Sequence, residues 1–166
     1  MENIINIFHY CIYLIDRKLH FLSNKINPFL LMYKIPYFQK KAKENGENLY
    51  EIYNDTFTNK NYGFNIMVAA GITIGVIFIL MVAFLKTAIF ILNFETKLNS
   101  GVLIFLGLIS YLICYFLIFT NDKYLRYFKN YSNWTKSKRR RNIWLCILFT
   151  ILSISFFFFS LLYLNH

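Results

Sequence analysis

The sequence predicts an all-α fold, an integral membrane helical bundle with three transmembrane helices and an N-terminal amphipathic helical region. Three apolar stretches, at about 64–92, 101–120 and 143–164, are each long enough to cross a bilayer. Only 16% of the residues are charged, against about 25% in soluble domains. A basic segment at 121–142 holds eight of the eighteen Lys and Arg residues, which is typical of a cytoplasmic loop between membrane helices.

Residues 1–62 are predicted to form cytoplasmic or interfacial amphipathic helices. The first, Met1 to Leu22, has an apolar face and a polar face, which favours a helix that lies at the membrane interface or packs on the bundle. The apolar face holds Ile4, Phe8, Cys11, Ile12, Ile15, Leu19 and Leu22, and the polar face holds Glu2, Asn6, His9, Tyr13, Asp16 and His20.

Shorter helices are predicted after it. Asn27-Pro28 is typical of a helix start, and Pro36 ends the apolar stretch that follows. Gly46 predicts a break before a short amphipathic helix, in which apolar side chains recur every four residues at Leu49, Tyr53 and Phe57.

Residues 63–166 are predicted to form the three-span membrane domain. The first span is uncharged from Phe64 to Leu85, about 33 Å of helix, and Lys86 can extend its amine to the far interface. A short turn at 93–100, with Glu95 and Lys97 as its charges, predicts an antiparallel hairpin with the second span. The third span opens with Trp144 and closes with Tyr163, as interfacial aromatics do.

The segment after Thr120 is predicted to stay helical for a few turns. Asp122 marks a helix boundary and Ser132-Asn133 the end. Tyr124, Phe128 and Tyr131 fall on one side of this helix, which we interpret as a candidate cytoplasmic contact surface.

Charge fixes the expected orientation. The region before the first span holds eight Lys and Arg, and the basic segment holds eight more, so the positive-inside rule places both in the cytoplasm and the C-terminus outside. The densest run of basic residues contains Lys136, Lys138, Arg139, Arg140 and Arg141. This run indicates the topology, and it could also bind anionic lipid headgroups or an acidic partner. Because membrane topology accounts for the net charge of +10, we do not expect nucleic acid as a partner.

Small residues recur within the spans and predict helix packing. Gly71 and Gly75 form a GxxxG pattern in the first span, and Gly107, Ser110 and Cys114 form a small-residue strip in the second. One interpretation is that the three spans pack on each other through these faces. The other is that the Gly71 face binds a second copy of the chain or a foreign helix.

The sequence contains no pattern typical of catalysis, and we expect no enzyme activity and no cofactor. The three histidines, His9, His20 and His166, are isolated from each other, and Cys11, Cys114 and Cys146 match no metal-binding spacing. The spans contain no Asp, Glu, His or Arg, which argues against coupled transport.

The section from Leu108 to Leu145 carries a resemblance. Tyr111-Leu112-Ile113-Cys114-Tyr115-Phe116, then the segment from Asn121 to Lys129 and the basic run before Trp144, resemble small uncharacterised multi-spanning membrane proteins of Bacteroidota. In those proteins a helix runs out of the membrane into an Asn-Asp-Lys-Tyr segment before a final span. The resemblance covers about a quarter of the chain. It implies a bacterial inner membrane and carries no activity; a mitochondrial inner membrane remains the alternative.

These observations favour a small membrane protein that works by protein–protein contact. A membrane immunity protein or a subunit of a larger membrane assembly fits them best, with anionic lipid and another membrane protein or a second copy as partners. The alternative is a self-associating pore or holin-like protein, which a polar stripe on the third span would favour. A third option is an accessory subunit of a respiratory complex.

Overall fold

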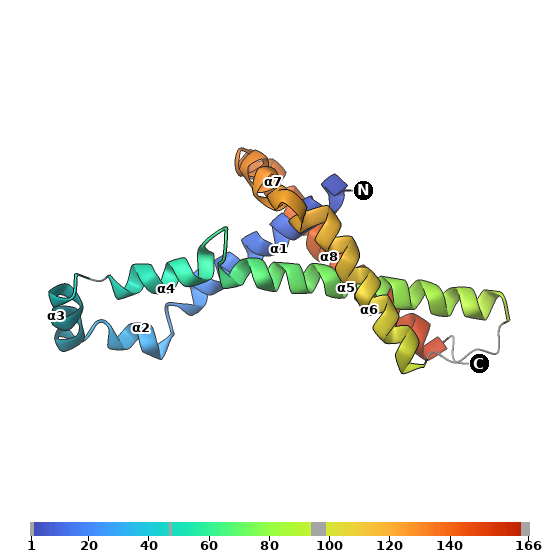
Figure 1. The fold of residues 1–166 in the computed structure, drawn as a ribbon, viewed down its shortest axis with the longest axis horizontal. Helices are drawn as coiled ribbons and strands as arrows, with labels where there is room; N and C mark the ends of the chain where they lie inside the picture. The colour runs from blue at the N-terminus through green and yellow to red at the C-terminus, as the bar shows by residue number, and fades with distance from the viewer. Residues whose placement is uncertain (1, 47, 94–98, 164–166) are drawn as a thin grey trace. The chain divides into compact units, whose positions relative to one another are not determined.

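The computed structural model describes residues 2–46, 48–93 and 99–163, and these form helices joined by short turns (Figure 1). In chain order the helices are α1 (Glu2–Ser23), α2 (Pro28–Met32), α3 (Pro36–Glu44), α4 (Leu49–Thr58), α5 (Phe64–Ile91), α6 (Ser100–Cys114), η1 (Tyr115–Phe119), η2 (Thr120–Asp122), α7 (Lys123–Ser132) and α8 (Lys136–Tyr163). The charges Glu95 and Lys97 of the predicted turn, and the end of the chain at His166, lie outside the described residues.

The predicted all-helical fold is confirmed. Three helical stretches are long and apolar enough to cross a membrane, at Phe64–Ile91, Ser100–Ser132 and Lys136–Leu162. Only 28%, 22% and 17% of their most apolar windows are buried inside the chain. Their outer surfaces are therefore mostly apolar, which suits lipid rather than water.

The chain divides into two compact units, which we describe separately. One is formed by Tyr13–Ala69, and the other, the span unit, by Met1–Ile12 together with Ala70–His166. The domain boundary predicted from the sequence lies near residue 63. In the structure the first twelve residues belong instead with the candidate spans, and both α1 and α5 continue from one unit into the other.

In the unit formed by Tyr13–Ala69, α4 packs on the second half of α1. The imidazole of His20 stacks on the Phe57 ring at 4.6 Å, and Asn24 Nδ2 donates a hydrogen bond of 2.9 Å to Asn54 Oδ1. Gly46, at a φ of 68°, turns the chain between α3 and α4, as its position predicts. Tyr53 and Phe57 of the predicted apolar repeat of α4 therefore face α1.

In the span unit, α5 contacts both other long helices. Ser110 Oγ of α6 lies 3.4 Å from Met81 Sδ of α5, and the rings of Phe84 on α5 and Phe156 on α8 meet edge to face at 5.3 Å. Small residues allow this approach because they remove side-chain bulk from between the helices. Ser110, Cys114, Ser153 and Ser160 are all buried.

The second span ends in a sharp turn. After the π-helical turn η1, Asn121 and Asp122 adopt left-handed conformations with φ of 55° and 52°. Asn and Asp are the non-glycine residues that tolerate this region best. The turn separates α6 from α7, so the predicted boundary at Asp122 and the predicted end at Ser132 are both confirmed.

The basic run does not form a loop but the first two turns of α8. Lys and Arg have high helix propensity, and Thr135 Oγ1 accepts a hydrogen bond of 3.3 Å from the Lys138 amide at the helix start. The third helix therefore begins at Lys136, seven residues before the predicted span.

Candidate functional site

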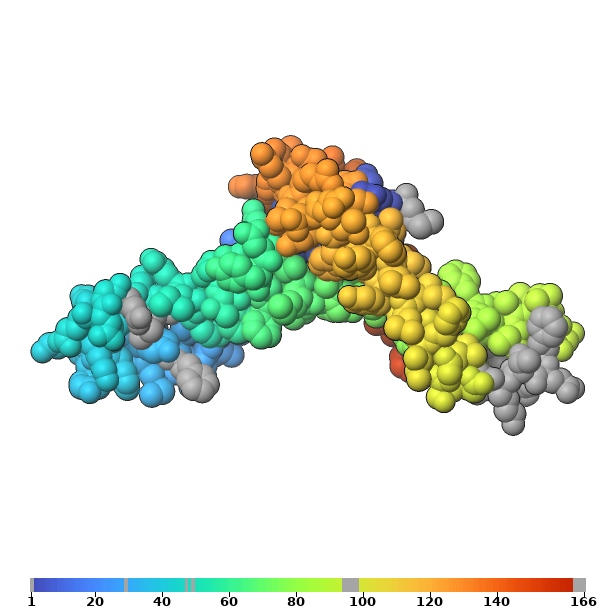
Figure 2. Space-filling view, viewed as in Figure 1, coloured from blue at the N-terminus to red at the C-terminus, as the bar shows by residue number. Residues whose placement is uncertain are grey.

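The first two turns of α1 bury side chains of the polar face, and the apolar face is buried only further along, at Cys11 and Ile12. Asn6 and His9 are fully buried, whereas the side chain of Ile4 is 71% exposed. An apolar side chain on the outside is stable where the surroundings are lipid, and polar groups then turn inward to find partners. In Figures 1 and 2 this start of α1 lies beside α7, with which it belongs to the span unit.

Side chains from three places cap the end of the second span. The carbonyl groups in the last turn of a helix have no partner within the helix. Here the Tyr115 carbonyl accepts from Thr120 Oγ1 at 3.0 Å, the Phe116 carbonyl from Lys123 Nζ at 3.2 Å, and the Leu117 carbonyl from Asn6 Nδ2 at 2.9 Å. Asn6 therefore links α1 directly to the exit of the span.

Glu2 fixes the start of α1 on α7. Its carboxylate accepts from Lys123 Nζ at 3.1 Å and from the Tyr127 hydroxyl at 3.1 Å. The hydrogen bond from Lys123 is the largest cause that lowers the pKa of Glu2 below its ordinary value. Next to it, the Tyr131 hydroxyl donates a hydrogen bond of 2.5 Å to Asn3 Oδ1.

Aromatic rings complete this α1–α7 junction. His9 lies among the rings of Phe119, Tyr124 and Phe128, at centroid distances of 5.8, 6.3 and 5.5 Å. Tyr10 contacts the rings of Phe128, Tyr131 and Trp134 at 4.8, 5.5 and 5.7 Å. Edge-to-face and tilted pairs at these distances are favourable beyond the area they bury.

The junction covers the predicted contact surface on α7. Tyr124, Phe128 and Tyr131 are 6%, 1% and 6% exposed, so the face that the sequence identified is occupied by the chain's own α1. Sequence reasoning missed Asn6 and His9 as its partners. The signal that was present is their spacing on the polar face of α1, together with Glu2.

The predicted packing residues separate into two groups. Ser110 and Cys114 of α6 are fully buried, whereas a Cβ atom built on Gly71, Gly75 or Gly107 would meet no atom within 4 Å. The glycines therefore do not mediate close packing among the described residues. Their backbone is accessible from outside the chain.

The five basic residues before the third span have different surroundings. Arg139 Nη2 donates to the Ser132 carbonyl at 3.1 Å, and Lys138 Nζ lies 5.5 Å from the centroid of the Trp134 ring. Lys136, Arg140 and Arg141 are exposed. The Trp134 ring thus connects the basic run to the α1–α7 junction.

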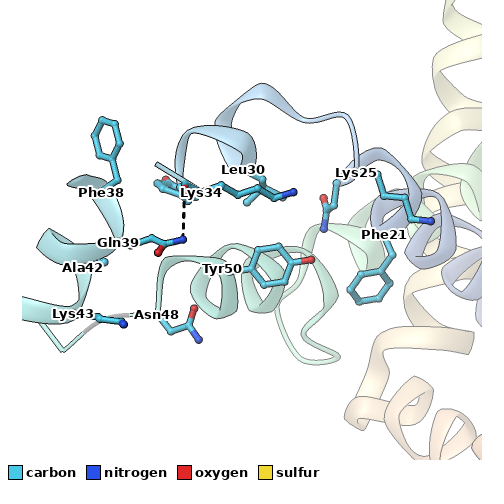
Figure 3. Close-up of a pocket in the computed structure, with 12 residues that line it drawn as sticks. Phe21, Lys25, Leu30, Lys34, Phe38, Gln39, Ala42, Lys43, Asn48 and Tyr50 are labelled. Carbon is cyan, nitrogen blue, oxygen red and sulfur yellow. Dashed lines mark hydrogen bonds between the residues drawn. The ribbon is translucent and has the colours of Figure 1, made fainter. Parts of the chain in front are cut away.

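The unit formed by Tyr13–Ala69 contains a pocket of about 610 Å³ (Figure 3). Lys25, Lys34 and Lys43 line it, together with aromatic and amide side chains. Lys25 and Lys43 lie at opposite ends of the pocket in Figure 3 and do not converge on one point. An anion site needs converging donors, so this arrangement does not define one.

The chemistry available in the described residues is limited. No group of three or more His, Cys, Asp and Glu side chains lies close enough in them to hold a metal ion. Burial raises the pKa of the Cys11 thiol to about 12, so this cysteine is almost entirely protonated at neutral pH and is a poor nucleophile.

No protein-family model, curated protein or solved structure matched the chain.

Proposed function

We propose that this protein acts in a membrane by contact with another membrane protein, as a membrane immunity protein or a subunit of a larger membrane assembly does. The observation that carries the proposal is the open glycine face of α5. Gly71 and Gly75 lie one helical turn apart, and a Cβ on either would meet nothing within 4 Å. Small residues at this spacing allow a second helix to approach the backbone closely.

The serine hydroxyl groups of the third span support a protein that acts by protein–protein contact rather than as a pore. Ser153 Oγ donates to the Phe149 carbonyl at 2.8 Å and Ser160 Oγ to the Phe157 carbonyl at 2.7 Å, within the same helix. Both serines are buried within the chain. A lumen needs polar groups that face water, and these hydroxyls are instead satisfied by their own backbone.

We infer further that the N-terminal region and the basic run face the cytoplasm and that the C-terminus lies outside. The two basic regions, with eight Lys and Arg each, support this orientation. The resemblance of the section from Leu108 to Leu145 to membrane proteins of Bacteroidota supports a bacterial inner membrane.

Crosslinking of the full chain in membranes tests the contact proposal. Gly71→Ile and Gly75→Ile should each abolish crosslinks to the partner or to a second, differently tagged copy, because the new side chain fills the approach surface. Gly107→Ile is the matched control, since its site on α6 is equally open. Crosslinks that persist in both α5 variants would overturn the proposal.

The design separates loss of contact from loss of fold. Because the new Cβ meets nothing within 4 Å at these sites, the variants should keep the helical content of the wild type, measured by circular dichroism in detergent. A variant that keeps its helicity and loses its crosslinks has lost the interface alone.

A further inference from the structure

A narrow apolar groove runs along the span unit, where α1, α5 and α8 meet. Its volume is about 560 Å³, within the range of about 300–1,000 Å³ that is usual for ligand sites. Its walls include Ile4, Phe8, Val76, Leu80, Leu148 and Leu152. Two contacts hold α1 on α8 beside it: the Phe8 and Phe149 rings meet at 5.8 Å, and Cys146 Sγ lies 3.9 Å from the Phe8 carbonyl.

The length of the groove matches one leaflet of a bilayer. On α8 the lining begins at Asn142 and ends at Leu152, and these ten steps correspond to about 15 Å of helix. Half of a hydrocarbon core of about 30 Å is the same distance. A phospholipid acyl chain occupies this depth.

The lining of the groove suits a hydrocarbon chain. Apart from Thr73, Cys146 and Asn142, aliphatic and aromatic side chains line it.

The helical register of α8 brings one basic position, Arg141, next to the polar end of the groove. Arg141 shares a face of α8 with Leu145, Leu148 and Leu152, because these positions follow it by four, seven and eleven residues. Lys138 precedes Asn142 by one turn, and its Nζ lies 5.5 Å from the centroid of the Trp134 ring. Arg140 points about 100° away from Arg141 around the helix and lies off the groove.

We propose that the groove binds one acyl chain of an anionic phospholipid, whose phosphate is held by Arg141. The apolar walls hold the chain by van der Waals contact, and the Arg141 guanidinium selects a negative headgroup. This site is separate from the glycine face of α5, and it does not depend on the proposed protein contact. Such a site binds one specific lipid, whereas a charged protein surface attracts anionic lipids in general.

Native mass spectrometry of the full-length protein tests the site, after exchange into detergent with 1-palmitoyl-2-oleoyl phosphatidylglycerol or with phosphatidylcholine of the same chains. The wild type should retain one phosphatidylglycerol and little phosphatidylcholine. Arg141→Gln should lower retention of phosphatidylglycerol about fivefold, the effect of one basic residue near an anionic headgroup. Leu148→Trp should abolish retention, because the indole fills the groove.

Matched variants off the groove make the result specific. Arg140→Gln removes the same charge and Ile151→Trp adds the same bulk at positions of α8 that do not line the groove, and both should retain the lipid as the wild type does. Circular dichroism of each variant should match the wild type. Equal retention by Arg141→Gln and Arg140→Gln, or retention by Leu148→Trp, overturns the proposal. The proposal is also overturned if the wild type retains a protein chain instead of lipid and the Leu148→Trp variant loses that protein chain.

Discussion

Lys123 Nζ lies 3.1 Å from a Glu2 carboxylate oxygen and joins residues 121 positions apart in the chain. The same ammonium group donates to the Phe116 carbonyl at 3.2 Å. One side chain thus holds the start of α1 and caps the end of the second candidate span. A cation near the carbonyl end of a helix is also favoured by the helix dipole.

Acid should loosen the α1–α7 junction, and Glu2→Gln should remove this response. The pKa of Glu2 is lowered chiefly by Lys123, so its contribution is fully present above the ordinary glutamate pKa of about 4.3 and is lost as the pH falls through the lower folded value. Trp134 packs on Tyr10 and Tyr131, and its fluorescence in a Trp144→Phe background reports the junction. A Glu2→Gln protein that titrates like the wild type would contradict this role.

Asn6→Leu should destabilise the chain by about 1–2 kcal/mol, because the partly buried Leu117 carbonyl then loses its donor. Unfolding in mixed detergent micelles measures the change. Asn133→Leu makes the same chemical replacement at an exposed position and should leave stability nearly unchanged. Equal effects of the two variants would show that the link from α1 to the span exit contributes nothing.

Phe128→Ala should cost about 3 kcal/mol in the same assay. Its ring is 1% exposed and contacts His9, Tyr10 and Tyr124, so truncation leaves a cavity in the centre of the junction. Phe105→Ala on α6 is the control, since that ring is 62% exposed and its loss should change stability by less than about 0.5 kcal/mol. A Phe128→Ala protein as stable as this control would mean that α7 does not depend on α1.

The number and position of the long helices could be predicted because length and apolarity determine them directly. Phe64–Ile91 begins at the predicted residue, and Asn121-Asp122 ends the second span where the polar pair interrupts the apolar run. These features are local in the sequence. A hydropathy pattern therefore contains all the information they need.

The packing of those helices could not be predicted in the same way. The periodicity of α1 distinguishes its two faces, but in lipid the apolar face is stable outside, so amphipathicity does not tell which face is buried. The aromatic face of α7 was visible in the sequence, whereas its partners Asn3, His9 and Tyr10 lie more than 100 residues away. A GxxxG pattern likewise does not show whether Gly71 is covered or open.

Labelling of introduced cysteines should establish the orientation of the chain, because the native cysteines should not react with the label. The native Cys11, Cys114 and Cys146 are all buried, and the Cys11 pKa of about 12 leaves very little reactive thiolate at neutral pH. Ser137→Cys, in the exposed basic run, should react with a membrane-impermeant maleimide only after the cells are opened. Leu92→Cys, exposed beyond the far end of the first span, should react in intact cells. The reverse pattern, with Ser137→Cys labelled from outside, would invert the proposed topology and place the basic run on the outer face of the membrane.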